Sequence, residues 1–283
     1  MPLSAGVISV AAFARTALLA LAITSLAACG RSPLPPSGIG PAIRGDARPH
    51  EGVARARTLP IQGIDVARYQ GRVDFEQVRR DGLHFVFIKS TEGKDYIDPN
   101  FYSNWRAAKA SGMAHGAYHF MTWCSLASQQ ARWFEKMVPN DPEALPPVLD
   151  LEWNNHSNCK NTHSKADILE KIRVMLDAME RHTGKLPIIY TDINFHRDIL
   201  AGEHFPNAFW LRSTAAEPHE RYHNRPWTFW QWTQTGHVAG IGPMVDRNAF
   251  YGSVDEWTVF LLTGCDPRAV ARLGPGGRCR LQK

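Results

Sequence analysis

Short apolar runs alternate with amphipathic stretches from residue 61 onward, and this alternation limits the possible folds more than any other feature of the chain. Stretches with helical periodicity separate the first five runs. Strand and helix in alternation predict parallel strands joined by crossover helices, which is an α/β fold. After residue 191 the runs come closer together without long helices, so the later strands follow one another through loops. The runs occupy residues 61–66, 85–88, 114–120, 148–152, 188–191, 209–211 and 228–232, and the helical stretches residues 74–80, 100–110, 126–137 and 166–182.

The chain of 283 residues divides into four predicted parts. Residues 1–29 form a lipoprotein signal peptide, and residues 30–59 form a flexible tether rich in Pro, Gly and Arg. Residues 60–260 form the folded domain, because α/β barrels commonly use about 200 to 250 residues as one unit. Residues 261–283 form a C-terminal tail stapled by a disulfide.

The N-terminal apolar run, residues 16–28, has the length of a signal peptide and is too short to span a bilayer comfortably. It runs into the string LAAC, which resembles the lipobox of bacterial lipoproteins and ends at Cys29. In a lipobox the cysteine becomes the lipid-bearing first residue of the mature protein. We therefore predict an exported lipoprotein of the periplasm or cell envelope, anchored to a membrane through Cys29. A plain cleaved secretory signal is the alternative, since Arg15 is the only early basic residue.

Four cysteines remain once Cys29 carries lipid, and export places them where disulfides persist. Four cysteines allow three pairings. We predict a bond between Cys124 and Cys159, because they follow neighbouring strands at the same rim. We predict a second bond between Cys265 and Cys279, because they flank a short Gly-rich segment that closes easily. No CxxC spacing indicates a zinc site.

The formal net charge of +5 and the pI near 9.0 suit an anionic partner such as a cell wall. Much of the basic excess lies in the arginines of the tether and the tail. Basic and aromatic residues are not interleaved along a binding face, so we predict no nucleic-acid partner. We expect the protein to be a monomer.

Acidic and aromatic residues stand at the carboxyl ends of the predicted strands. If the strands close a barrel, these ends meet at one rim, where the functional residues of such barrels lie. Asp150 and Glu152 are two positions apart on one strand, so their side chains share a face with Cα atoms about 6.7 Å apart. Such a rim lines a cleft that suits a sugar, with its hydroxyls and apolar ring faces. The strand-end residues are Asp65, Glu92, Tyr118, His119, Asp150, Glu152, Tyr190, Trp210, Gln231 and Trp232.

The carboxylates among them match the chemistry of glycoside hydrolysis. One protonated carboxyl group delivers a proton to the leaving oxygen, while a second carboxylate supports the developing positive charge or a water. Glu152, beside Trp153, is the candidate acid, because crowding and apolar surroundings raise a carboxyl pKa. Asp246, where an eighth strand should end, is a further candidate. The alternative is that Asp150 caps a turn and Glu152 is solvated beyond the strand end.

His115 and His119 have a spacing that binds a metal ion on a helix. On a strand, four residues separate them by about 13 Å, which is too far to share one ion. We therefore predict no metal site. His119 is expected to hydrogen-bond a carboxylate or to lie satisfied in the barrel wall.

The ordered motifs of residues 60–255 resemble glycoside hydrolase family 25, the muramidases or lysozymes of bacteria and phages. This resemblance implies an irregular TIM-like barrel of five β/α units followed by three further β-strands. It also implies that Glu152 is the general acid and that Asp150, Asp65 and Asp246 assist it. The motifs are GIDV at 63–66, YQG at 69–71, FIKSTEG at 87–93, DPNF at 98–101, GAYHF at 116–120, PVLDLE at 147–152, IYT at 189–191, Trp210, WQW at 230–232 and VDRN at 245–248.

On this basis we predict an N-acetylmuramidase that cleaves the β-1,4 bond between N-acetylmuramic acid and N-acetylglucosamine in peptidoglycan, without a cofactor. Asp150 either orients the substrate's N-acetyl group for attack on the anomeric carbon, or a water attacks directly. Two other functions are open: an inactive wall-binding protein that uses the same cleft as a lectin-like groove, and a metal-dependent carbohydrate deacetylase built on the histidines. The predicted substrate-binding residues are Glu92, Tyr118, Tyr190, Trp210 and Gln231.

Overall fold

The computed structural model describes residues 49–154, 163–266 and 268. All of them belong to one of the two units into which the chain divides, residues 34–283. The predicted signal peptide with Cys29, the predicted tether up to residue 48, and Cys159 and Cys279 lie outside the described residues.

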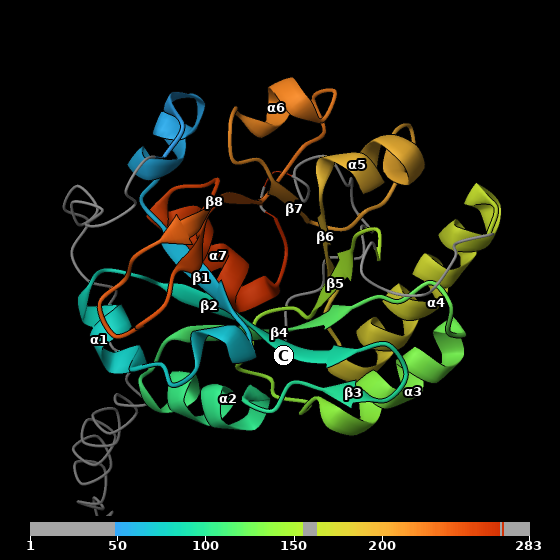
Figure 1. Cartoon of the computed structure of the whole chain (residues 1–283), viewed down its shortest axis with the longest axis horizontal. Helices are drawn as coiled ribbons and strands as arrows, with labels where there is room; N and C mark the ends of the chain where they lie inside the picture. Colours follow the sequence, from blue (N-terminus) through green and yellow to red (C-terminus); the bar gives the residue numbers. More distant parts are fainter. Residues whose placement is uncertain (1–48, 155–162, 267, 269–283) are drawn as a thin grey trace, which may run out of the picture. The chain divides into compact units, whose positions relative to one another are not determined.

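Eight strands close a barrel, and a short further strand, β3, pairs antiparallel with the end of β2 (Figure 1). From β1 through β2, β4, β5, β6 and β7 to β8 each neighbouring pair is parallel. β9 closes the ring by pairing antiparallel with both β8 and β1. The predicted α/β barrel is therefore confirmed. The strands are β1 (Gln62–Val66), β2 (Phe85–Glu92), β3 (Tyr96–Ile97), β4 (Ala114–Phe120), β5 (Val148–Leu151), β6 (Ile188–Thr191), β7 (Phe209–Arg212), β8 (Phe229–Gly236) and β9 (Val245–Phe250).

Helices cover the outside of the first half of the barrel, only short helical turns lie between β6 and β8, and the ten-residue α7 follows β9. The longest helix, α4, begins with a capping box between Ser164 and Asp167 and ends where Gly184 adopts a left-handed φ of 71°. The helices are η1 (Glu51–Thr58), η2 (Arg68–Gln70), α1 (Phe75–Arg80), α2 (Phe101–Ala110), α3 (Ala127–Met137), α4 (Lys165–Thr183), α5 (Ile193–Phe195), the π-helical turn η3 (His196–Leu200), α6 (Pro218–Arg221) and α7 (Val254–Thr263).

Aromatic side chains fill the barrel interior below the carboxyl rim. Phe85 and Phe87 of β2 contact Phe229 of β8, with ring centroids 5.2 and 5.3 Å apart. Trp257 and Phe260 of α7 continue the same cluster, so this helix closes the amino end of the barrel. This close-packed interior limits the movement of the strands and so keeps the residues at the carboxyl rim in position.

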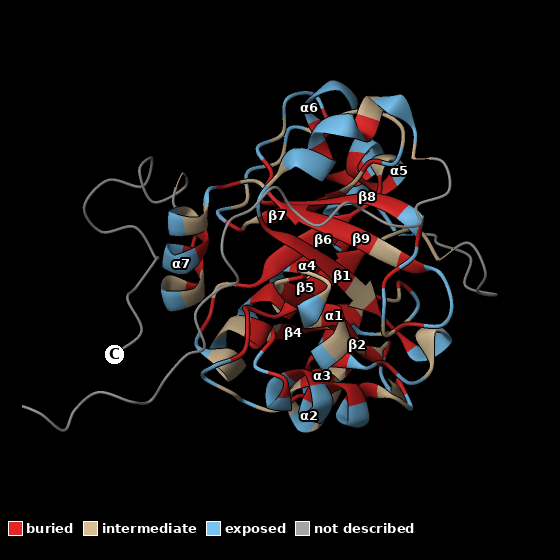
Figure 2. Ribbon diagram, turned by 90° about the vertical axis from the view of Figure 1, so that its left-hand side faces the viewer, coloured by how far each residue is buried: buried red, intermediate tan, exposed pale blue. Residues whose placement is uncertain are grey.

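Helix α7 is not predicted from the sequence. Its apolar residues do not lie on a single face, because Val259 and Leu262 are exposed while Trp257 and Phe260 are buried. Figure 2 shows one side of α7 buried and the other exposed. The folded domain therefore continues through α7 to Thr263, past the predicted boundary at residue 260.

The folded domain also begins before residue 60, because residues 51–58 of the predicted tether form η1. One turn of this helix places Val53 and Ala56 on the same side, and both are fully buried. Arg55 fixes the outer side through an ion pair of 2.8 Å with Glu217.

In the described part of the chain, none of the helices combines the length and the apolar character that crossing a membrane requires.

Candidate active site

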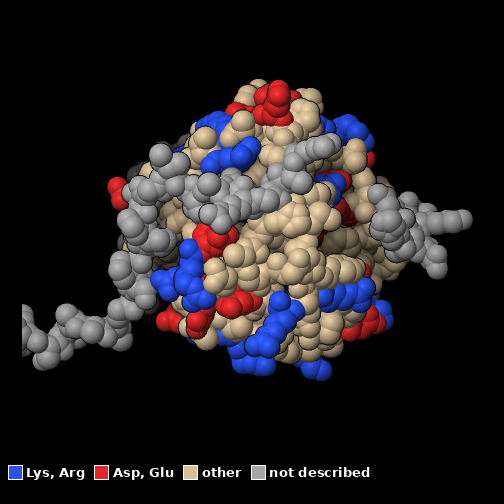
Figure 3. Space-filling model, turned by 60° about the vertical axis from the view of Figure 1, so that its left-hand side comes forward, with Lys and Arg blue, Asp and Glu red and all other residues tan. Residues whose placement is uncertain are grey.

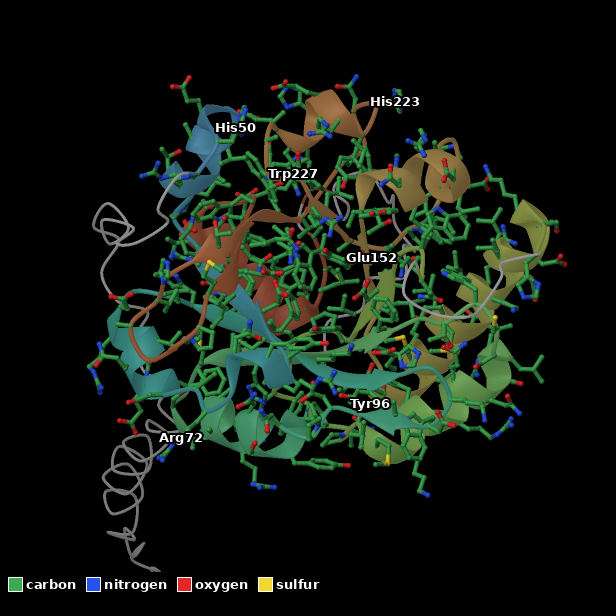
Figure 4. All side chains as sticks on the ribbon, viewed as in Figure 1. His50, Arg72, Tyr96, Glu152, His223 and Trp227 are labelled. Atoms are coloured by element: carbon green, nitrogen blue, oxygen red, sulfur yellow. The ribbon has the colours of Figure 1, made fainter. Side chains whose placement is uncertain are left out.

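The four predicted catalytic carboxylates line one pocket at the carboxyl rim of the barrel. Asp65 lies on β1, Asp150 on β5, Glu152 directly after β5, and Asp246 on β9. Figure 4 shows Glu152 beside β5, on the side of the barrel where β5 and β6 lie. The same pocket is lined by four of the five predicted substrate-binding residues: Tyr118, Tyr190, Trp210 and Gln231.

Asp246 reaches this rim in a different way from the one predicted. It stands at the start of β9 and not at the end of an eighth parallel strand. Because β9 runs antiparallel to β1, the start of β9 lies beside the end of β1, and Asp246 is directly opposite Asp65 in the register. Two like charges at such a cross-strand position repel one another, so the pair favours holding a proton.

Gln231 joins these two carboxylates. Its Nε2 donates to Asp65 Oδ1 at 3.0 Å and to Asp246 Oδ2 at 2.9 Å. Its Oε1 accepts from the Tyr190 hydroxyl at 2.8 Å. Since Gln231 is buried and its amide is occupied by three protein partners, it holds Asp65 and Asp246 in place rather than presenting a free amide to a ligand.

Asn248 gives Asp65 a second fixed donor. Its Nδ2 donates to Asp65 Oδ1 at 2.8 Å, and its Oδ1 accepts from Trp210 Nε1 at 2.8 Å. Trp210 is buried against Phe87 of the barrel interior. Trp210 therefore lies at the bottom of the pocket, as part of its lining, and its hydrogen bond orients Asn248.

Burial raises the pKa of both carboxyl groups of this pair. The pKa of Asp65 rises from 3.8 to about 6, and the hydrogen bonds from Asn248 and Gln231 oppose the rise. The pKa of Asp246 rises from 3.8 to about 8, first through burial and then through the charge of Asp65. Asp246 therefore retains its proton at neutral pH.

The second pair, Asp150 and Glu152, differs in depth. Asp150 is only 7% exposed, and burial followed by the charge of Glu152 holds its pKa well above the ordinary value. The side chain of Glu152 is 22% exposed. Burial also raises its pKa, while the nearby Arg212 guanidinium lowers it. The more accessible carboxyl group thus lies nearer the pocket mouth.

Two basic residues that the sequence analysis did not single out complete the site. Lys89 of β2 lines the pocket and, with Arg212, lowers the pKa of Asp150. Arg212 of β7 lies with Nη1 3.8 Å from Glu152 Oε2 and Nη2 3.3 Å from Asp192 Oδ2. Every second residue of a strand faces the barrel interior, so Lys89 follows Phe85 and Phe87 on β2, and Arg212 follows Trp210 on β7. This alternation is the sequence signal that indicates both basic residues.

Glu92 does not line the pocket with the other predicted residues. Its Oε2 accepts from Lys89 Nζ at 2.6 Å. Trp232, another strand-end aromatic residue, is buried in the outer layer under Arg247, whose guanidinium is 5.5 Å from its ring.

The two histidines of β4 face the helices and not the pocket. His119 bonds Thr91 Oγ1 at 2.8 Å and Gln130 Oε1 at 3.2 Å, and burial lowers its pKa to about 4. His115 packs against Trp105 of α2. Across residues 49–154 and 163–266, no three His, Cys, Asp or Glu side chains are grouped so that they could hold a metal ion.

Two of the cysteines are described. They are Cys124, which follows β4, and Cys265, which follows α7. Because Cys159 and Cys279 lie outside the described residues, the predicted pairings stay predictions.

The barrel and its rim define a class of enzyme. Glycoside hydrolases use a pair of carboxyl groups that flank the bond to be broken, one of them kept protonated by its surroundings. Here a closed barrel brings such groups to its carboxyl rim, with pKa values raised by burial. These features are typical of a glycoside hydrolase.

The chain belongs to the glycosyl hydrolases family 25, whose model matches residues 64–241. Uncharacterized protein YegX of Escherichia coli K12 is 36% identical over 212 residues, which cover 71% of this chain and 73% of that protein. Lysozyme M1 of Streptomyces globisporus is 32% identical over 209 residues, 71% of each chain. The structure of a family 25 glycosyl hydrolase from Bacillus anthracis matches with a TM-score of 0.68 and 33% identity, covering 75% of this chain and 97% of that one.

Proposed function

We propose that this family 25 glycoside hydrolase is an N-acetylmuramidase, which hydrolyses the β-1,4 bond between N-acetylmuramic acid and N-acetylglucosamine in peptidoglycan. The relative Lysozyme M1 supports this activity. The observation that carries the proposal is the meeting of Asp65, Asp150, Glu152 and Asp246 at one pocket, each with a raised carboxyl pKa.

Glu152 is proposed as the proton donor. Its side chain is the more exposed of its pair, so a glycosidic oxygen at the pocket mouth can reach it. The raised pKa keeps a proton available, and Arg212, itself paired with Asp192, holds the carboxyl group in position. Donation of this proton to the leaving oxygen accompanies rupture of the bond between that oxygen and the anomeric carbon.

Asp150 is proposed to orient the substrate's N-acetyl group. Its Oδ1 is buried, and no hydrogen-bond donor among the described residues reaches it. An amide N–H from the substrate would satisfy this oxygen and favour the ionised form of Asp150. The acetamido oxygen then forms a bond to the anomeric carbon as the leaving group departs, and water opens this intermediate with net retention. Direct attack by water would invert the anomeric centre, so NMR of the first-formed anomer distinguishes the two routes.

The site favours an enzyme over a purely wall-binding protein. A sugar-binding groove needs no cluster of four carboxyl groups in buried and partly buried places, since a carboxyl group that is ionised there costs folding free energy. The deacetylase alternative rested on His115 and His119. His119 is hydrogen-bonded to Thr91 and Gln130, and His115 bonds the Met113 carbonyl and packs against Trp105 of α2, so neither faces the pocket.

The activity is tested by the release of reducing ends from purified peptidoglycan. The wild-type protein should release them, and Glu152→Gln should not, while both bind the polymer. Equal release by the two proteins would show that Glu152 is not the proton donor. No release by the folded wild-type protein would refute the activity.

The proposal includes export and a lipid anchor on Cys29. A lysozyme acts on the cell wall, which requires export, and the LAAC string supplies the lipidation site. Labelling with a radioactive fatty acid should mark the wild-type chain and not Cys29→Ser. Label in both chains, or in neither, would contradict the anchor. The protein is further proposed to be a monomer, which sedimentation tests.

The disulfides are proposed as Cys124 with Cys159 and Cys265 with Cys279. Peptide mapping without reduction should recover two linked peptide pairs of these compositions. Crossed pairs would refute the assignment.

A further inference from the structure

We propose that a strip of alternating tyrosine and basic side chains beside the pocket binds the carboxylates of the peptide that peptidoglycan carries. The strip, called the rim strip, consists of Tyr69, Arg68, Tyr96 and Lys89. This inference rests on the proposed function and specifies which part of the polymer the enzyme recognises beyond its sugars.

The rim strip is continuous from solvent to the pocket. The Arg68 guanidinium carbon is 5.0 Å from the ring centre of Tyr69 and 5.9 Å from that of Tyr96. Lys89 Nζ is 5.8 Å from the ring centre of Tyr96 and 5.0 Å from that of Phe120. Because Lys89 and Phe120 also line the catalytic pocket, a polymer seated there passes directly onto the strip.

Backbone contacts hold the strip in place before any ligand binds. The Arg68 backbone N–H donates to Asp98 Oδ2 at 2.9 Å, and Asp98 is buried. The Tyr96 carbonyl accepts from Trp133 Nε1 at 2.8 Å. A binding surface that is already ordered loses less entropy on association.

Arg68 is the basic group of the strip that is open to a ligand. Lys89 is paired with Glu92 at 2.6 Å, whereas none of the ion pairs formed among the described residues includes Arg68. Arg68 is exposed, and Tyr69 beside it is 68% exposed. A guanidinium group binds a carboxylate in a two-point geometry, and an exposed aromatic ring stacks on an apolar sugar face.

Peptidoglycan offers both chemistries within one repeat. Its amino sugars have apolar ring faces, and the short peptide on each muramic acid carries free carboxylates. A neutral amino-sugar polymer offers only the first. The face drawn in Figure 3 carries basic and acidic side chains intermixed. It therefore has no broad basic surface that would attract any anionic polymer, and binding of a carboxylate depends on individual basic groups such as Arg68.

The test compares two polymers and two variants. The polymers are purified peptidoglycan and the same glycan after an amidase has removed its peptides. Initial rates of cleavage are measured at substrate concentrations well below KM, so that they report kcat/KM. The variants are Arg68→Gln and the matched control Arg72→Gln, which removes an equal charge from an exposed arginine. Figure 4 shows Arg72 at the edge of the domain, away from Glu152. Thermal unfolding verifies that each variant is folded.

The quantity to compare is the ratio of kcat/KM on the peptide-bearing polymer to that on the stripped polymer. Arg68→Gln should lower this ratio about three- to fivefold, the size expected for one accessible ion pair, and 0.5 M NaCl should lower the wild-type ratio in the same direction. Arg72→Gln should leave it within twofold.

An unchanged ratio for Arg68→Gln, with wild-type cleavage of both polymers, would overturn this inference and leave the proposed function standing. Equal decreases for Arg68→Gln and Arg72→Gln would also overturn it, because total charge would then be the cause. Failure of the wild-type protein to cleave either polymer would refute the proposed function itself.

Discussion

Replacing Asp246 by Asn should stabilise the protein at alkaline pH while impairing its activity. In the folded state the pKa of Asp246 is raised from 3.8 to about 8. The folded protein therefore keeps a proton that the unfolded chain has already released between these two pH values. Since the unfolded state then binds fewer protons, the free energy of unfolding falls as the pH rises through this window.

The magnitude follows from the width of the window. Between pH 5 and pH 8, a fully buried group with this pKa would remove about 4 kcal/mol, at about 1.4 kcal/mol per pH unit. Water in the open pocket screens part of this cost, so we expect about 2 kcal/mol. Asn has the same shape, and its oxygen still accepts the hydrogen bond from Gln231, but it carries no charge at any pH. Asp246→Asn should therefore be more stable than the wild type at both pH values, and its advantage should be about 2 kcal/mol larger at pH 8 than at pH 5.

Urea unfolding of both proteins at pH 5 and pH 8 measures this difference. Asp95→Asn is the control, because Asp95 is an exposed carboxylate outside the pocket. It should shift stability by the same small amount at both pH values. Parallel pH profiles for Asp246→Asn and the wild type would refute the reasoning, since they would mean that Asp246 is ionised in the folded state like an ordinary surface carboxylate.

Three further changes test the roles of individual side chains. Glu152→Gln should lower turnover about 10²- to 10⁴-fold. An aryl glycoside whose leaving group needs no proton should restore cleavage by Glu152→Gln much more than by Asp150→Asn. Equal recovery in the two variants would mean that the acid is wrongly assigned. Arg212→Gln should move the basic limb of the kcat/KM profile to higher pH, because Arg212 lowers the pKa of Glu152; an unmoved limb would contradict this. Gln231→Leu should raise the pKa of Asp65, because it removes a hydrogen bond that lowers this pKa, and the acidic limb of the kcat/KM profile should move to higher pH with it. A profile identical to that of the wild type would mean that Asp65 does not control this limb.

Much of the barrel follows from local patterns. The helical periodicity at residues 126–137 and 166–182 agrees with α3 and α4 to within one residue at each end. The strand-end rule brings Asp65, Asp150 and Glu152 to one pocket, because the rule depends on parallel strands and not on the register between them.

What the patterns miss depends on contacts between distant parts of the chain. A two-residue alternation does not reveal strand direction, so Asp246 is expected at a strand end although it starts the antiparallel β9. The bridge from Gln231 to Asp65 and Asp246 exists only because β8, β9 and β1 close the ring. The alternation of β7 indicates that Arg212 faces inward, but it does not indicate the partner, because Glu152 follows a different strand.

The mass of the fragments released from peptidoglycan tests the central claim most directly. Purified peptidoglycan is incubated with the wild-type protein, the new reducing ends are reduced with borohydride, and the soluble fragments are analysed by mass spectrometry. Hydrolysis of the proposed bond predicts fragments that end in reduced N-acetylmuramic acid, absent from a parallel digest with Glu152→Gln. Fragments that end in reduced N-acetylglucosamine, or release of acetate without any new reducing end, would contradict the account.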